Sequence, residues 1–358
     1  MTLGTTADAD APTSPRARLA AVDTLRVIGV VAVMVIHAGP FAHGPTRLGA
    51  VWDAATLANQ AARFAVPMFF VFAGYFWARH GDTPAALAAG ARTMVPRLVG
   101  RFALWSLIFL LPFESDRIFR RFPEGFLQNL QANVTWAATH PATVLLQGTS
   151  GHLWFLMSLA MTVALVALLR RLCTTRTVLL LGAGLFAASL LAGAYRRTAL
   201  GFALPFNPRN GPGFAVLPVA LGCWLAGRTP SPRWATLGLG LLGGGALLAA
   251  GELQWLHVRH GTTLAQDLVL GTFGMGVGAA LLGLAGPAWL RVPWLAALGP
   301  LVLGVYAAHP ILVDLLVPLT RRAASPWADL TAVLAIALGT LGLVRWLSRW
   351  RATRWLVS

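Results

Sequence analysis

Long apolar runs separated by short polar connections dominate this chain. A helix needs about 20 mainly apolar residues to cross a bilayer. We predict ten such helices, at residues 20–39, 61–78, 97–112, 151–169, 177–194, 212–227, 235–250, 266–285, 295–318 and 329–347. The pattern therefore predicts an all-α, polytopic integral membrane protein with about ten transmembrane helices.

The two ends of the chain and one long connection stand apart from this pattern. Residues 1–18 are polar and carry two aspartates, unlike a secretory signal, so we expect a disordered cytoplasmic N-terminal tail. Residues 19–350 are predicted to form one transmembrane domain, and residues 351–358 a short cytoplasmic C-terminal tail. The connection at 113–150 mixes acidic and basic side chains, and it either covers a binding site or is a plain connector.

Composition narrows the class of protein. Hydrophobic residues make up 57% of the 358 residues and charged residues 11%, and the mean hydropathy is +0.67. A soluble domain of this composition would expose large apolar surfaces. The 28 basic residues are all arginines and give a formal net charge of +16, but they lie in short clusters between the apolar runs. We interpret these clusters as a topology signal, and we expect a lipid bilayer rather than nucleic acid as the partner.

The distribution of the arginines predicts the orientation in the membrane. If the N-terminus is cytoplasmic, sixteen arginines lie on the cytoplasmic side, ten lie on the opposite side, and Arg26 and Arg63 lie within apolar runs. Cytoplasmic loops of membrane proteins are enriched in positive charge. We therefore expect a multi-pass protein of a bacterial inner (plasma) membrane with both termini in the cytoplasm.

The first predicted helix carries three ionisable side chains, Asp23, Arg26 and His37. Such residues are costly in hydrocarbon and usually serve function. Arg26 and His37 are eleven residues apart. On an α-helix, two side chains at this spacing point to within about 20° of the same face and lie about 16 Å apart along the axis. The alternative interpretation is an Arg26–Asp23 ion pair at the helix end, with His37 reaching the membrane interface.

Four strings along the chain resemble motifs of the acyltransferase-3 family of integral-membrane acyltransferases. They occur in family order and cover essentially the whole chain after residue 19, and Ala73 stands where serine is usual. The strings are Asp23-x-Leu25-Arg26 followed by ten residues and His37; Val66-Pro67-Met68-Phe69-Phe70-Val71-Phe72-Ala73-Gly74-Tyr75-Phe76; Gly151-His152-Leu153-Trp154-Phe155-Leu156; and Tyr306-x-x-His309-Pro310.

The resemblance implies transfer of an acyl group, typically acetyl from cytoplasmic acetyl-CoA, to a hydroxyl on a carbohydrate, a lipid-linked sugar or another cell-envelope acceptor. Acyl transfer to an alcohol needs a base or a nucleophile, and an imidazole can be either near neutral pH. His37 is the candidate for that role. A hydrogen-bonded core histidine is the alternative interpretation of His37.

Arginines supply candidate contacts for acyl-CoA. Arg26 can pair with a CoA phosphate or hold its helix in place through Asp23. The second cytoplasmic loop is predicted to carry Arg79, Arg92, Arg97 and Arg101, a cluster that suits anionic phosphates. The family has an arginine pair in this region, but the spacing Arg97-x-x-x-Arg101 departs from its Arg-x-x-Arg pattern. Positive-inside topology explains such a loop equally well.

Four residues are candidates for contact with the acceptor or the acyl group: His152, Trp154, Tyr306 and His309. Trp154 can instead be an aromatic side chain at the membrane interface, and His309 a hydrogen-bonded residue before a proline kink. We expect no metal, because no His-x-x-x-His pair or neighbouring carboxylate supplies ligand spacing on one helix.

Two other classes of protein remain open from the residues alone. A proton-coupled transporter also places arginine and histidine inside a helical bundle, although this sequence shows no internal repeat. A non-catalytic membrane scaffold is the other alternative, since a fold does not fix function.

Overall fold

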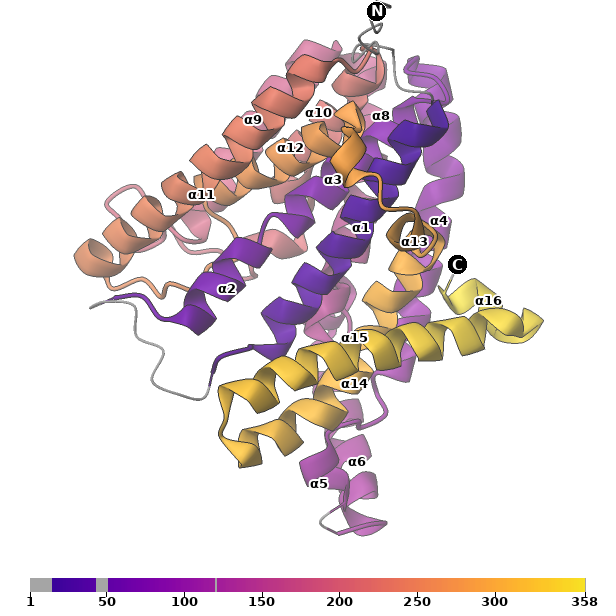
Figure 1. Ribbon diagram of the computed structural model, residues 1–358, viewed down its shortest axis with the longest axis vertical. Coiled ribbons are helices and arrows are strands. Elements are labelled where there is room, and N and C mark those ends of the chain that lie inside the picture. Colours follow the sequence, from indigo (N-terminus) through magenta and orange to yellow (C-terminus); the bar gives the residue numbers. More distant parts are fainter. Residues whose placement is uncertain (1–14, 43–50, 120, 358) are drawn as a thin grey trace, which may run out of the picture.

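The computed structural model of the chain describes residues 15–42, 51–119 and 121–357, and within these ranges every regular element is a helix (Figure 1). The all-α prediction is confirmed. The predicted N-terminal tail lies outside the described residues up to residue 14. The elements are α1 (Pro15–Ala38), α2 (Ala54–Ala62), α3 (Ala65–Ala78), α4 (Pro84–Ile108), α5 (Ser115–Phe119), α6 (Glu124–Thr139), α7 (Pro141–Gln147), η1 (Gly151–Leu153), α8 (Trp154–Leu172), α9 (Thr175–Ala192), η2 (Pro208–Asn210), α10 (Pro212–Ala226), α11 (Pro232–His260), α12 (Leu270–Ala285), η3 (Ala288–Leu290), α13 (Pro293–Ala296), η4 (Gly299–Leu301), α14 (Val302–Ala323), α15 (Pro326–Arg349) and α16 (Arg351–Val357).

The described residues contain seven helical stretches that are long and apolar enough to cross a membrane. Two shorter apolar helices, α10 and α12, and the long helix α4 coincide with the other three predicted runs. The prediction of a multi-pass membrane protein is confirmed, with seven clear candidate spans against about ten predicted. The seven stretches are Leu19–Ala38, Ala54–Ala78, Gly151–Leu172, Thr175–Ala192, Pro232–His260, Pro293–Ala323 and Pro326–Arg349.

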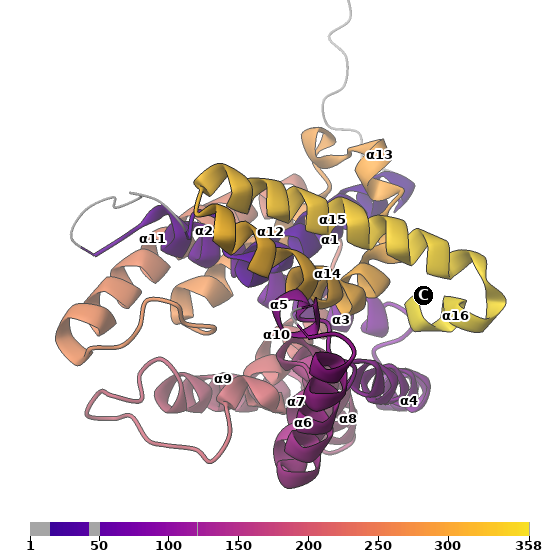
Figure 2. The ribbon, with the colours of Figure 1, turned by 90° about the horizontal axis from the view of Figure 1, so that it is seen from below.

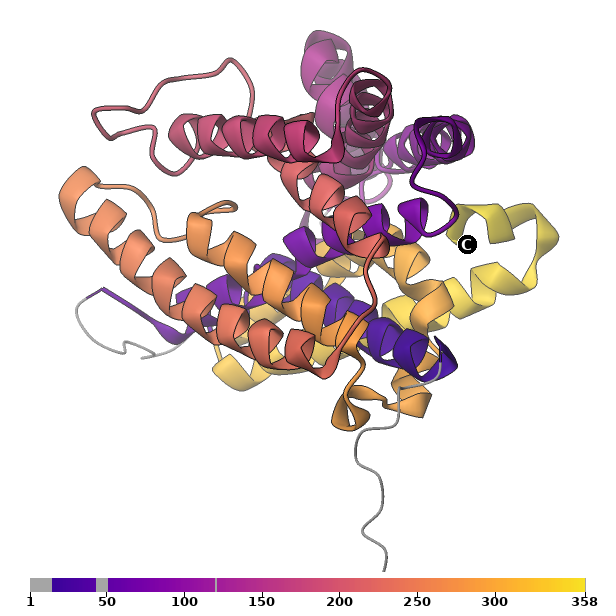
Figure 3. The same ribbon diagram turned by 90° about the horizontal axis from the view of Figure 1, so that it is seen from above.

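Helix α1 runs through the middle of the bundle and begins at one end of it (Figure 1). The loops that follow α9 and α11 lie towards the other end, which we call the far end. Helices α14 and α15 pack on each other and on α1, as the view from below shows (Figure 2). Helices α11 and α12 run side by side on another flank (Figure 3).

Glycines allow the close packing of α11 against α12. A Cβ atom at Gly271 would lie 2.2 Å from the backbone nitrogen of Ala249, and one at Gly245 would lie 2.6 Å from that of Met275. Small residues let membrane helices approach closely where lipid offers no hydrophobic drive for association. This pair fixes the start of α12 and, with it, the preceding loop 261–269 at the far end.

Helix α4 begins well before the predicted run at 97–112. The Thr83 side chain caps the helix by accepting a hydrogen bond from the backbone of Ala86 (3.2 Å), and Pro84 occupies the first turn. Alanine-rich sequence then continues the helix. The prediction that Arg92, Arg97 and Arg101 lie in a loop is therefore wrong, because all three lie within this helix; their position on the cytoplasmic side stays a prediction.

Two other segments are also more ordered than the sequence pattern indicated. The connection at 113–150 contains α5, α6 and α7, which project at the far end (Figures 1 and 2). The C-terminal residues form α16, where the Trp105 indole donates a hydrogen bond to the carbonyl of Leu356 (3.2 Å). The side chain of Val357 is buried against Gly304. The C-terminal segment thus folds back onto α4 and α14.

Candidate active site

Three histidines from distant parts of the chain meet towards the far end of α1. His37 lies in the last turn of α1, His152 in η1 and His309 in α14. The ring centroids of His37 and His309 are 5.2 Å apart, those of His152 and His309 are 5.5 Å apart, and those of His37 and His152 are 6.5 Å apart. We call these three residues the histidine cluster.

The members of the histidine cluster differ in accessibility. His152 and His309 are buried, with exposed fractions of 3% and 0%. His37 is exposed, and its ring forms part of the wall of a cavity. This accessibility argues against the interpretation of His37 as a core histidine. Within the histidine cluster, His37 is the residue best placed to meet a substrate.

Pro310 explains the orientation of the His309 ring. A proline has no N–H, so residue 310 cannot donate to the carbonyl of Tyr306 four residues earlier, as a helix would normally require. The Nδ1 of His309 lies 2.7 Å from that carbonyl. Because a carbonyl only accepts, Nδ1 carries the proton and Nε2 keeps its lone pair. Within the described part of the chain this buried Nε2 has no hydrogen-bond partner.

His152 and Tyr306 connect η1, the short helix that leads into α8, to α14 in both directions. The Tyr306 hydroxyl donates to the backbone carbonyl of His152, and the Nε2 of His152 lies 3.2 Å from the carbonyl of Ala307. The Nδ1 of His152 lies 2.9 Å from the Ser150 hydroxyl. The carbonyl contact fixes the ring tautomer, with the proton on Nε2 and a lone pair on Nδ1 that accepts from Ser150. Both buried histidines are thus held by backbone groups of packed helices.

A cavity of about 500 Å³ extends from the histidine cluster along α1. Arg26, His37 and Arg63 all line this cavity, and its remaining walls are mainly aromatic and aliphatic. The volume falls within the range of about 300–1,000 Å³ that is usual for small-molecule sites. We call it the main cavity. The shared helix face predicted for Arg26 and His37 thus corresponds to one continuous space.

Arg26 and Asp23 form an ion pair in the first half of α1. The guanidinium Nη1 lies 2.9 Å from the Asp23 carboxylate, and both side chains are about one-third exposed (34% and 29%). Asp23 packs against Gly299, where an added Cβ would lie 2.6 Å from the carboxylate. The pair therefore fixes the position of the guanidinium, which faces the main cavity.

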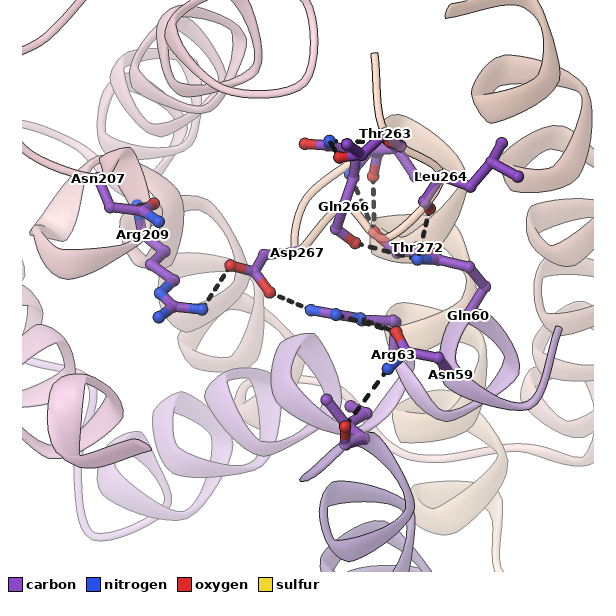
Figure 4. A network of polar contacts seen from close by, with 12 residues as sticks. Asn59, Gln60, Arg63, Asn207, Arg209, Thr263, Leu264, Gln266, Asp267 and Thr272 are labelled. Carbon is purple, nitrogen blue, oxygen red and sulfur yellow. Dashed lines mark hydrogen bonds and ion pairs between the residues drawn. The ribbon is translucent and has the colours of Figure 1, made fainter. Parts of the chain in front are cut away.

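A second polar group borders the main cavity at the far end. The Asp267 carboxylate, in the loop between α11 and α12, accepts hydrogen bonds from Arg63 and Arg209 with its two different oxygens (Figure 4). Asn59 accepts from the Nε (3.0 Å) and Nη2 (2.9 Å) of Arg63. The Arg209 guanidinium also lies 5.5 Å from the centroid of the Trp154 ring. We call the trio Arg63, Asp267 and Arg209 the arginine bridge.

Pro67 explains why Arg63 lies at a break between two helices. The prolyl nitrogen cannot donate to the Arg63 carbonyl four residues earlier, and α2 ends at Ala62 while α3 begins at Ala65. The break lets Arg63 leave the helix direction and reach Asp267. In α2, Gln60 donates to the carbonyl of Leu264 (2.9 Å) and so holds the same loop (Figure 4).

The charges of the arginine bridge keep Asp267 ionised. Burial acts to raise the pKa of the Asp267 carboxyl, but the positive charges and hydrogen bonds of Arg63 and Arg209 outweigh it and hold this pKa below its usual range. The Arg63 side chain is only 11% exposed. A buried guanidinium needs such a partner, so the three side chains stabilise one another.

A family model described as an acyltransferase domain matches residues 19–349 of the chain. The chain belongs to the acyltransferase-3 family. It is therefore a membrane acyltransferase, as the four strings predicted, rather than the transporter or scaffold that the residues alone left open. No curated protein matches the chain, and no solved structure matches it.

The structure of this acyltransferase separates the arginines of α4. Met94 and Leu98 line the main cavity, and Arg101 lies on nearly the same helix face, within about 20° of Met94. Arg92 points about 160° away from Met94. None of Arg92, Arg97 and Arg101 is among the residues that line the cavity. Their predicted contacts with CoA remain predictions, with Arg101 the best oriented.

The four predicted acceptor-site residues lie together. His152, Trp154 and Tyr306 line the main cavity, and His309 packs behind His37 and His152. Trp154 is 8% exposed and lies beneath Arg209, so it is a buried residue of the site rather than an aromatic side chain at the bilayer surface. The described residues of the connection at 113–150 line neither this cavity nor the second cavity described below.

The arginine bridge was absent from the sequence-based site. Two signals pointed to it: Arg63 lies within an apolar run, and Asp267 lies at the start of the predicted run 266–285. Charged residues in such places usually face partners or cavities inside the bundle. No pattern in the sequence pairs them with Arg209, which lies in the short helix η2 before α10.

Proposed function

We propose that this acyltransferase moves an acyl group, most simply acetyl, from cytoplasmic acyl-CoA to a hydroxyl of a carbohydrate or other cell-envelope acceptor. The acceptor is on the opposite side of a bacterial inner membrane, and both termini face the cytoplasm. The observation that carries the proposal is the main cavity, which joins Arg26 in the first half of α1 to the accessible His37 in its last turn.

The shape and lining of the main cavity suit the acyl end of acyl-CoA. An apolar channel with a few polar groups matches a thioester and its pantetheine arm, which are mainly aliphatic and carry isolated amides. The nucleotide phosphates then remain near the N-terminal end, where Arg26 and the arginines of α4 supply positive charge. The donor therefore enters from the end of the bundle at which α1 begins.

His37 is the proposed catalytic residue. In a direct transfer, the acceptor O–H gives its proton to His37 while its oxygen bonds to the thioester carbon; the C–S bond breaks, and the CoA thiolate takes up the proton. In a two-step transfer, a ring nitrogen of His37 first holds the acyl group and CoA leaves, and the acceptor hydroxyl then displaces the nitrogen. Release of one equivalent of CoA before acceptor is added marks the second path.

His309 and His152 act as positioning residues. The lone pair of His309 Nε2 is buried beside His37, and the Nδ1 proton is committed to the Tyr306 carbonyl. Nε2 can therefore only accept a hydrogen bond, which favours a ring orientation of His37 that directs an N–H towards His309 and a lone pair towards the cavity. This arrangement leaves the basic nitrogen of His37 available to the substrate.

The test uses purified protein in lipid vesicles with radiolabelled acetyl-CoA and a pool of sugar acceptors. His37→Ala is expected to lower transfer by about 10²–10⁴-fold, the usual contribution of a general base. The matched control is His140→Ala, because His140 is an exposed histidine at the end of α6, outside the main cavity. Melting curves of the variants in detergent show whether each one is folded.

Two outcomes contradict the proposal. A folded His37→Ala protein that retains full transfer removes His37 from the mechanism. A wild-type protein that neither binds nor consumes acetyl-CoA excludes the proposed donor, and longer acyl-CoA chains then test the class of donor. Loss of transfer in His37→Ala with normal activity in His140→Ala supports the proposal.

A further inference from the structure

A second cavity lies next to the main cavity at the far end. Its volume is about 490 Å³, and it is formed by the end of α9, the segment 204–209 and the loop 265–268. We call it the side cavity. Arg209, Asp267 and Leu268 line both cavities. The two spaces therefore share a wall, and two of the three residues of the arginine bridge belong to that wall.

The arginine bridge closes this wall with side chains rather than backbone. Asp267 binds Arg63 on one side and Arg209 on the other, and these residues come from three separate segments of the chain (Figure 4). Rotation of the Asp267 side chain alone would break both ion pairs without moving a helix. A wall of this kind can open and close locally.

The chemistry of the side cavity differs from that of the main cavity. Asn207, Gln266 and Arg196 line it, together with the aromatic ring of Phe206. The Asn207 Oδ1 accepts from the backbone of Arg209 and the Gln266 Nε2 donates to Thr263, which leaves the Asn207 amide nitrogen and the Gln266 amide oxygen to face a ligand. One amide donor, one amide acceptor, an arginine and an aromatic face suit a ligand with many hydroxyl groups. Arg196 and Arg209 outnumber Asp267, so the charge favours a neutral or anionic ligand over a cationic one.

We propose that the side cavity binds a sugar-like acceptor and that the arginine bridge is the gate through which the acceptor hydroxyl reaches His37. This inference rests on the proposed function and names the acceptor side of the same site. In the closed state the bridge separates the thioester from water at the far end. An acceptor hydroxyl that hydrogen-bonds to Arg209 replaces Asp267 there and opens the passage.

A permanently open gate should let water replace the acceptor. Water then attacks the thioester carbon; the C–S bond breaks, and the products are the free carboxylate, CoA thiol and one proton. Asp267→Ala is therefore expected to hydrolyse acyl-CoA without acceptor faster than wild type, at least about tenfold if the ion pairs hold the closed state. Asp267→Glu retains a carboxylate for the two arginines and is expected to hydrolyse acyl-CoA no faster than wild type.

Thiol labelling tests the gate without any turnover. Val33→Cys places a thiol in the main cavity one helical turn before His37, and Ala265→Cys places one in the side cavity. Both are made in a Cys173→Ser background, because Cys173 is a partly exposed free cysteine. The probe is the membrane-impermeant anion 2-sulfonatoethyl methanethiosulfonate, added outside sealed vesicles. The vesicles used are those in which the N-terminal tag of the protein is protected from added protease, so that the N-terminus lies inside. The reagent then reaches only the far end.

The gate predicts slow labelling of Val33→Cys and fast labelling of Ala265→Cys. Adding Asp267→Ala should speed labelling of Val33→Cys by at least about tenfold, whereas Asp267→Glu should not. The matched control is Asp116→Asn, which breaks the exposed Arg322–Asp116 pair and should leave labelling unchanged. Equal labelling of Val33→Cys with and without Asp267, whether fast or slow, overturns the gate.

Kinetics with a sugar acceptor test the ligand of the side cavity. Arg196→Gln is expected to raise KM for the acceptor while KM for acyl-CoA stays the same, and Arg259→Gln, an exposed arginine at the end of α11, is the control. An unchanged acceptor KM in Arg196→Gln overturns the assignment of the side cavity. If the wild type consumes no acyl-CoA, the proposed function fails, and the labelling result still decides whether the bridge is a gate.

Discussion

The histidine cluster and the arginine bridge face the same cavity but are held in different ways. His152 and His309 are fixed by backbone carbonyls of packed helices. Asp267 is held by two side chains, Arg63 and Arg209, rather than by backbone groups. Carbonyls of a helix cannot move without the helix, so they suit a group whose tautomer must stay constant. Side-chain partners suit a group that has to move.

The histidine cluster and the arginine bridge also differ in charge. The hydrogen bonds of the two buried histidines fit neutral rings, whereas the arginine bridge needs an ionised Asp267 between two guanidinium groups. An uncharged cluster leaves lone pairs available for proton transfer. The charged arginine bridge stabilises the closed wall between the main cavity and the side cavity and disfavours apolar ligands beside it. The comparison predicts that damage to the first region affects catalysis most, and damage to the second affects access and stability.

Among the residues that support His37 or border its cavity, His309 should have the largest effect when replaced. His309→Ala removes the donor that satisfies the buried Tyr306 carbonyl, which should cost about 1–3 kcal/mol of unfolding free energy. It also removes the group that orients His37, and misplacement of a catalytic group lowers the rate by about 10²-fold. Melting temperature and transfer rate of the purified variant measure the two effects.

A second substitution separates the two roles of His309. Pro310→Ala restores an N–H at residue 310, four residues after Tyr306, so this N–H can bond to the carbonyl that His309→Ala leaves empty. The double variant should therefore regain stability but not transfer. Recovery of both properties would mean that His309 only satisfies the backbone, and the histidine cluster would lose its positioning role.

Neutralising Asp267 should have a smaller combined effect than replacing His309, because it lowers stability to a similar extent but leaves the group that orients His37 in place. The loss of stability should depend on pH. Asp267→Asn is expected to cost about 1–3 kcal/mol at pH 7, as for a lost hydrogen bond to a charged group. Because the pKa of Asp267 in the folded protein is below its usual value, its stabilisation is complete above about pH 4 and is lost as the pH falls through the folded-state pKa. The stability difference between wild type and variant should be constant from about pH 8 to pH 5 and should shrink only below about pH 4.

An exposed ion pair provides the control for this prediction. Asp116 and Arg322 form a bridge at the far end, with 36% and 58% of their side chains exposed. Asp116→Asn should change stability by less than about 1 kcal/mol, because solvent screens such pairs. A stability difference for Asp267→Asn that shrinks between pH 7 and pH 5 would mean that a group other than Asp267 titrates there.

The sequence predicted the helices and the histidine cluster for the same physical reason. Apolar runs of spanning length must form helices in a membrane. His37, His152 and His309 lie at or within such helices, so their strings remain recognisable along the chain. The tautomer of His309 also follows from the sequence once its helix is known, because Pro310 leaves a carbonyl empty.

The arginine bridge could not be predicted in this way. Asp267 is 204 residues from Arg63 and 58 residues from Arg209, and two of the three residues lie in irregular segments. Periodicity carries no information on which loops meet. The extent of α4 was missed for a different reason: arginines on opposite faces hid the helix that its cap and alanines had already specified.

The smallest effect on stability should come from replacing Asp23. Its ion pair with Arg26 is a third charged group, besides the arginine bridge and the Arg322–Asp116 pair. Arg26 and Asp23 are both about one-third exposed, so Asp23→Asn should cost less than about 1 kcal/mol. Arg26→Gln should leave stability equally unchanged but raise KM for acyl-CoA, because it removes a positive charge from the donor end of the main cavity. If Asp23→Asn raises KM as much as Arg26→Gln does, the pair acts as a unit that positions the guanidinium. If neither variant changes KM, the pair only stabilises the helix, and the phosphates of the donor must be bound by the arginines of α4.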